Sequence, residues 1–254
     1  MIVFLILLLL LVVIPCLRWL PYYSPATKQQ HYQSALHMDD TLRIAFIGDS
    51  WADWHKKHQC KIPVFISSKA ECNVDVYISG ISGLTSKQIY LSMFQDDSVR
   101  NAIEWGPDYC VVMAGINDAD RKMGTGYYKE NMRLIIDFLL SNQITPVIIE
   151  IPYFNTRRSF QIRNFEGKLQ YLLSMAIHFS PIDCVHQYRK AHRELIEEEG
   201  WSQRIIYIPE SSWAPEGYRD SRNLYDDLQM HLNEKGYEVL DSCIASSILR
   251  YKKN

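Results

Sequence analysis

The sequence lacks the features that direct a chain to nucleic-acid or nucleotide chemistry. Its formal net charge is −2 at pH 7 over 254 residues, so it has no basic excess to neutralise a phosphate backbone. It has no Gly-rich loop ending in Lys that would hold a nucleotide phosphate. It also has no internal repeat and no low-complexity run. We therefore expect no nucleic-acid partner, and one domain with a sizeable core.

Cysteine is scarce, with six in the chain. Cys110 and Cys184 lie in apolar surroundings and are predicted to be core residues. Cys60 and Cys72 flank a loop-like stretch and would pair only in an oxidising compartment. Pairing also requires their Cα atoms to lie close together, which the sequence leaves open.

Charged residues are absent from the N-terminal stretch Met1 to Cys16, which is uninterrupted apolar sequence. Arg18, Trp19, Tyr22 and Tyr23 follow, as an interfacial charge and an aromatic belt would. Extended through residue 20, the run approaches the about 20 residues that span a bilayer. We predict a transmembrane anchor or signal segment over residues 1–23, and hence a membrane partner.

Two other interpretations of this segment are open. Ser24-Pro25-Ala26 offers a signal-peptide cleavage site, although no Lys or Arg precedes the apolar run. A lipoprotein signal ending at Cys16 is disfavoured by Pro15, which stands where a small residue is expected.

Arg18 and Lys28 would favour a cytoplasmic domain by the positive-inside count. A domain behind an N-terminal apolar segment is more often exported, so we expect it to be membrane-anchored or exported and extracytoplasmic.

Residues 24–40 are polar and aperiodic, which is typical of a linker. The folded domain is predicted over 41–254, where strand-like and helical patterns alternate. Strands are expected at about 42–47, 74–78, 109–114, 146–151 and 204–209. Helices are expected at about 86–94, 127–140, 165–179, 184–199 and 233–251. This alternation predicts an α/β fold with a parallel sheet covered on both faces.

Four short motifs follow one another along this domain. Ile47-Gly48-Asp49-Ser50 ends the first predicted strand, and a serine there sits where open α/β sheets build their sites. The stretches 79–86 and 114–118 follow the next two strands, and 226–233 lies near the C-terminus. Together the four motifs resemble the SGNH superfamily of GDSL-type hydrolases, which are serine esterases, over roughly residues 42–250. The resemblance implies a flavodoxin-like three-layer α/β/α sandwich with a five-stranded parallel sheet.

The resemblance assigns a nucleophile and its base. A serine hydroxyl needs a histidine to take its proton, and the histidine needs an orienting acid. Ser50 is the predicted nucleophile and His231 the predicted base. The family places an Asp three residues before this His, but position 228 is Leu. Asp227 is our first candidate for the acid and Asp226 the reserve, and a dyad without an acid is the third option.

The resemblance also assigns donors for an oxyanion. They are the backbone N–H groups of Ser50 and Gly83 and the side-chain amide of Asn117, with Gly80 as a competing glycine. Glycine lets the backbone approach a ligand closely, and Asn supplies an uncharged donor. We interpret Asp49 and Asp118, which adjoin these residues, as turn and loop anchors.

Other candidate groups carry less weight. His55, His58 and Cys60 match no known closed metal site, so we predict no metal, and no motif indicates a cofactor. Trp51, Trp54 and Tyr153 lie near strand ends, where they would serve equally as a platform for a sugar ring or acyl chain, or as core packing.

The resulting hypothesis is a serine hydrolase that cleaves a carboxylic ester through an acyl-enzyme on Ser50. An O-acetylated carbohydrate at the cell surface is the preferred substrate. The alternatives are an O-acyltransferase using the same site, a lipase or phospholipase, and a non-catalytic binding module that retains the fold.

Overall fold

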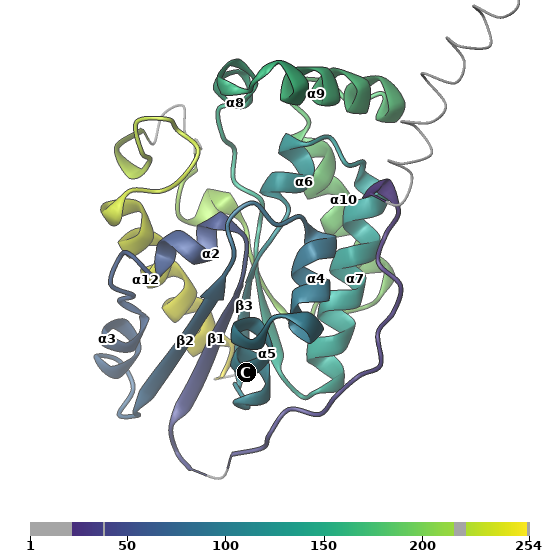
Figure 1. Ribbon diagram of the computed structural model, residues 1–254. Helices are drawn as coiled ribbons and strands as arrows, with labels where there is room; N and C mark the ends of the chain where they lie inside the picture. Colours follow the sequence, from purple (N-terminus) through teal and green to yellow (C-terminus); the bar gives the residue numbers. More distant parts are fainter. Residues whose placement is uncertain (1–21, 38, 216–221, 253–254) are drawn as a thin grey trace, which may run out of the picture.

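The computed structural model describes residues 22–37, 39–215 and 222–252. Its centre is one sheet of five parallel strands in the order β2-β1-β3-β4-β5, which confirms the predicted sheet (Figure 1). β3 is buried along its whole length, as the sequence Tyr-Cys-Val-Val-Met requires of a strand covered on both faces. The strands are β1 (Leu42–Gly48), β2 (Val74–Gly80), β3 (Tyr109–Met113), β4 (Thr145–Ile149) and β5 (Ile206–Ile208).

Helices cover both sides of this sheet (Figure 1). One side carries α2 (Ser50–His55), α3 (Ile62–Ser67) and α12 (Glu234–Tyr251). The other carries α4 (Ser86–Gln95), α5 (Asp97–Glu104), α7 (Thr125–Ser141) and α10 (Val185–Glu198). The helices α6 (Ile116–Asp120), α8 (Thr156–Ile162) and α9 (Phe165–His178) lie toward the end of the sheet where the strands end.

The five predicted helices correspond to α4, α7, α9, α10 and α12. Asn233 caps α12 as its sequence suggests, because its side chain accepts from the N–H of Gly236. The sequence did not indicate α2, α3, α5, α6 or α8. These helices have five to eight residues, too few for an apolar period to show.

The strand order changes direction around β1, whose neighbours are β2 and β3. In open α/β sheets such a point leaves a crevice at the carboxyl ends of the strands. The two backbones meet closely there: a Cβ on Gly48 would lie 2.2 Å from the carbonyl oxygen of Met113. Glycine at position 48 therefore lets the chain turn into α2 at this crevice.

The segment 24–37, expected as a linker, has no regular structure but is fastened along the domain. The N–H of Ala26 donates to Asn131, that of Gln29 to Tyr90 and that of Ser34 to Asn142, at 2.7–2.8 Å. In Figure 1 it runs as a strap down the side formed by α4 and α7. We refer to it as the strap.

The predicted membrane segment lies, up to residue 21, outside the described residues. Within the described ranges, no helix combines the length and apolar composition needed to cross a bilayer. The five cysteines described, Cys60 and Cys72 among them, are free thiols.

Candidate active site

Ser50 and His231 meet at the crevice beside β1. Ser50 is the first residue of α2, and the side chain of Asp49 caps this helix by accepting from the N–H of Trp51 at 3.0 Å. His231 comes from the loop before α12, 181 positions away, and its Nε2 lies 2.9 Å from Ser50 Oγ. This is hydrogen-bond distance between a hydroxyl and the group able to take its proton.

The acid beside His231 is Asp226 and not Asp227. Oδ2 of Asp226 lies 3.7 Å from Nδ1 of His231, whereas Asp227 is exposed. At 3.7 Å the two side chains are in ionic contact, but this distance is longer than that of a hydrogen bond. The structure therefore places the reserve candidate Asp226, and not the first choice Asp227, beside the imidazole.

A small hairpin explains why Asp226, five positions before His231, faces the imidazole. Tyr225 and Leu232 form an antiparallel bridge, and the N–H of Asp226 donates to the carbonyl of His231 at 2.9 Å. Asp226 and His231 are thus opposite one another, so their side chains are neighbours. Asp227 falls in the turn that joins the two sides and points to solvent. Oδ1 of Asp226 accepts from the N–H of Met230 at 3.0 Å, which fixes the carboxylate.

An aromatic ring and a cation lie behind the imidazole. Trp54 stacks on His231 with ring centroids 4.4 Å apart and planes inclined by 7°. Lys57 lies over the Trp54 ring, with its Nζ 4.8 Å from the ring centroid. Burial lowers the pKa of His231 below its usual value, Asp226 opposes this, and the charge of Lys57 adds to it. The imidazole is therefore neutral at pH 7 and free to accept a proton.

Asn117 of α6 and Arg121, which caps the end of α6, bind the turn that contains Gly83. Asn117 Nδ2 donates to the carbonyl of Leu84 at 3.0 Å, and Arg121 Nη2 donates to the carbonyl of Gly83 at 2.7 Å. Gly83 has a φ of +84°, a conformation that favours glycine. The competing Gly80 is the last residue of β2, and its carbonyl accepts from Lys56. Asn117 and Arg121 thus tie the Gly83 turn to the end of β3.

Two buried carboxyl groups support this end of the sheet. Burial raises the pKa of Asp49 to about 7 and that of Asp118 to about 6. Asp118 accepts from the N–H and the hydroxyl of Ser86, so it anchors the start of α4. This confirms the interpretation of both residues as turn and loop anchors.

The three aromatic candidates have different surroundings. Trp51 is 2% exposed and packs edge-on against Trp213, so it is a core residue. Tyr153 lies under the guanidinium of Arg189, 4.0 Å from its ring centroid. Trp54 alone touches a candidate catalytic side chain.

A small apolar cavity opens between the residues that flank Ser50. Its volume of about 10 Å³ is close to the least that can hold one water molecule. Asp49, Trp51, Ala114, Ile116 and Ile151 contribute to its lining.

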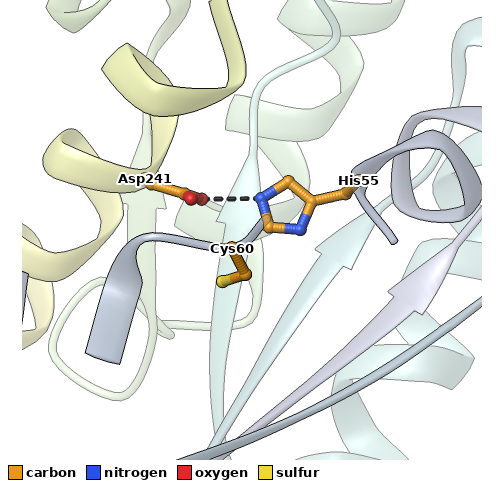
Figure 2. A group of neighbouring side chains, drawn as sticks. All are labelled: His55, Cys60 and Asp241. Atoms are coloured by element: carbon orange, nitrogen blue, oxygen red, sulfur yellow. Dashed lines mark hydrogen bonds and ion pairs between the residues drawn. The ribbon is translucent and has the colours of Figure 1, made fainter. Parts of the chain in front are cut away.

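His55 and Cys60 also come together, joined by Asp241 of α12, which the sequence did not indicate (Figure 2). His55 Nε2 lies 2.6 Å from Asp241 Oδ1, and the N–H of Lys61 donates to Oδ2 at 2.6 Å. Tetrahedral zinc would hold nitrogen and oxygen ligands about 3.3 Å apart, longer than the contact observed. Since both carboxylate oxygens have protein donors, the group is arranged as a buried clamp between α12 and the loop after α2. His58 lies outside the group and stacks on Tyr237.

Sequence reasoning missed Lys57 and Arg121. Lys57 follows Trp54 at a spacing of three, and Arg121 follows Asn117 at a spacing of four, so each pair shares a helical face. This spacing is the sequence signal by which Lys57 and Arg121 could have been found. Nothing in the sequence indicated that Trp54 would meet a histidine 177 positions later.

Solved structures similar to this chain have the same fold. A lipase/acylhydrolase from Enterococcus faecalis is 18% identical, with 82% of this chain and 95% of that chain covered and a TM-score of 0.57. An acetyl xylan esterase is 16% identical over 82% of this chain and all of its own, with a TM-score of 0.58. An acetylxylan esterase from Geobacillus stearothermophilus is 16% identical, with 84% and 96% covered and a TM-score of 0.52. No curated protein matches the sequence.

The family is shown by the match over most of the domain. The model of the GDSL-like lipase/acylhydrolase family matches residues 46–239, which include Ser50, Gly83, Asn117 and His231. With the parallel sheet and the paired serine and histidine at its edge, this chain belongs to the GDSL-like lipase/acylhydrolase family.

Proposed function

We propose that this protein is a serine esterase that removes a short acyl group, such as acetyl, from a carbohydrate. The observation that carries the proposal is the 2.9 Å hydrogen bond between Ser50 Oγ and His231 Nε2. A binding module that had lost its chemistry would have no need to keep this pair, so the contact favours an enzyme.

The proposed reaction follows from the positions of these groups. His231 takes the proton of Ser50 as Oγ attacks the ester carbonyl, and Asp226 stabilises the imidazolium that forms. The N–H groups of Ser50 and Gly83 and the amide of Asn117 stabilise the oxyanion. His231 then gives its proton to the leaving alcohol. Water attacks the acyl-enzyme by the same route in reverse and releases the acid and Ser50.

Two observations support a short acyl group on a sugar. The cavity next to Ser50 is small, which suits an acetyl methyl better than a long chain. Two of the structural neighbours are named as acetyl xylan esterases. The apolar run Met1 to Cys16 supports a membrane-anchored or exported protein with an extracytoplasmic domain. Cell fractionation with protease accessibility tests that location.

The test of the activity is hydrolysis of p-nitrophenyl acetate by the full chain beside its Ser50→Ala variant. Turnover should fall by at least about 10³-fold in the variant. Hydrolysis of acetylated xylo-oligosaccharides then tests the carbohydrate. Equal turnover in both proteins would contradict the proposal. Acetyl transfer to an added alcohol without net hydrolysis would make the protein an acyltransferase.

A further inference from the structure

α9 turns its apolar side away from the protein. Its exposed side chains recur at the spacing of one helical face, and Phe165 at its start is 84% exposed. The residues that face inward are Tyr171 and Ser174. The outer face of α9 consists of Phe165, Leu169, Leu172, Leu173 and Ile177, which are 40–84% exposed.

This arrangement is the reverse of what water favours. A surface helix of a soluble domain places its apolar stripe on the core and its polar residues outside. Burying one Leu or Phe contributes about 1.5–3 kcal/mol, so five such residues on one face represent a large unused stabilisation. Ile162 and Phe179, 53% and 93% exposed, extend the patch at either end of α9. Patches of this kind mark an interaction site.

The N-terminal end of the described chain lies against the opposite, inner side of α9. The hydroxyl of Tyr23 hydrogen-bonds to Ser174, and its ring contacts that of His178 at 5.3 Å between centroids. The strap then holds this entry point to the domain (Figure 1). The apolar run ends at Cys16, six residues before Tyr22. At no more than about 3.6 Å per residue, the end of the run can lie no farther than about 22 Å from Tyr22, the neighbour of Tyr23, which contacts α9.

Charge distinguishes a lipid surface from an apolar protein partner. α8 and α9 carry Arg157, Arg158 and Lys168, whereas Glu166 is their only acidic residue. Arg157 and Arg158 are exposed. An apolar helical face bordered by basic side chains is typical of a helix lying in the interface of an anionic bilayer.

We propose that the outer face of α9 lies on the surface of an anionic lipid bilayer, beside the point where the apolar N-terminal run reaches the domain. The aliphatic side chains and Phe165 would enter the boundary between headgroups and acyl chains, and Arg157 and Arg158 would contact lipid phosphates. α8 and α9 lie toward the end of the sheet where the strands end (Figure 1), and Ser50 follows the end of β1 as the first residue of α2. If the proposed function holds, its ester substrate is then one presented close to the membrane surface.

The test is photo-crosslinking of the full chain in vesicles. Phe165→p-benzoylphenylalanine and Leu172→p-benzoylphenylalanine place the probe on the outer face of α9. Val64→p-benzoylphenylalanine is the matched control, because Val64 of α3 is 63% exposed but remote from α9 in Figure 1. All three sites are exposed, so the probe should leave the fold intact. Vesicles of phosphatidylcholine are compared with vesicles containing phosphatidylglycerol, and adducts are identified by mass.

We expect about tenfold more lipid adduct at positions 165 and 172 than at 64, with a higher yield when phosphatidylglycerol is present. Lipid adducts no more frequent than at the control position would overturn the proposal. So would crosslinks from these positions mainly to residues 1–20 of the same chain or to a second copy. No ester is turned over in this experiment, so its result is independent of whether the proposed hydrolysis is correct.

Discussion

Replacing Asp226 with Asn tests the arrangement of the proposed triad. Asn keeps an oxygen that can accept from the N–H of Met230, so the hairpin should hold its shape. It removes the negative charge that lies 3.7 Å from Nδ1 of His231. The change therefore isolates the effect of the charge on the imidazolium that forms as Ser50 attacks.

The expected size of the effect follows from this distance. Coulomb attraction at 3.7 Å is about 1 kcal/mol in surroundings like water and about 4 kcal/mol at an effective dielectric constant near 20. Both side chains are 18% exposed, so the pair falls between these limits. Since about 1.4 kcal/mol corresponds to a factor of ten in rate, kcat should fall between about 5-fold and about 700-fold.

The assay is p-nitrophenyl acetate hydrolysis, with the Asp227→Asn variant as matched control. That variant removes the same charge one residue away, from an exposed turn position. We expect its kcat to stay within about twofold of the parent, as for an exposed charge. If Asp227→Asn lost more activity than Asp226→Asn, or if Asp226→Asn lost none, the assignment of Asp226 would be refuted. Circular dichroism of both variants checks that the fold is retained.

Three further predictions concern the surroundings of the site. Lys57→Met removes a charge that lowers the pKa of His231, so the acidic limb of the kcat/KM profile should move to higher pH; an unmoved limb would count against a neutral His231 as base. Asp241→Ala leaves buried His55 without its partner and should lower the free energy of unfolding in urea by about 3–5 kcal/mol, and Asp241→Asn by clearly less; equal losses would show that the hydrogen bonds of the clamp contribute little. Burial raises the pKa of Asp49 in the folded protein to about 7 from its ordinary 3.8, so it stays protonated there while the unfolded chain ionises, and its contribution to stability is lost as pH rises through this window. Asp49→Asn keeps the helix cap without this loss, so its Tm should gain on the parent between pH 4 and pH 7; parallel Tm curves would contradict the raised pKa.

The sequence was sufficient for the sheet and for most of the site because both depend on local signals. A buried parallel strand is a short apolar run, and its carboxyl end is where a site residue must come. Ser50, Gly83 and Asn117 each follow such a run, so the topology alone brings them to one edge of the sheet. His231 was found by resemblance, because no local pattern indicates which loop returns to that edge.

The sequence favoured Asp227 over Asp226 because it shows spacing along the chain but not which residues pair across a hairpin. A family spacing of three residues applies to one loop shape. Here the loop closes as a hairpin, and the hydrogen bond between the N–H of Asp226 and the carbonyl of His231 decides which side chain faces the imidazole. The pairing of Asp226 with His231 depends on the shape of the turn between them. Gln229 in this turn has a φ of +58°, a conformation that its residue type does not indicate in the sequence.

α9 shows what an apolar period in the sequence cannot predict. Its apolar period predicted a helix over 165–179 and located one face, but a period cannot say what covers that face. In the structure this apolar stripe lies outside, with Phe165, Leu169, Leu172, Leu173 and Ile177 exposed. Tyr23, which directly precedes the strap, joins the entry of the chain to the inner side of the same helix through its hydrogen bond to Ser174. An attachment made by the N-terminal run would therefore be transmitted to a fixed point of the domain, and α9 would set the orientation of Ser50 toward the surface to which the chain is attached.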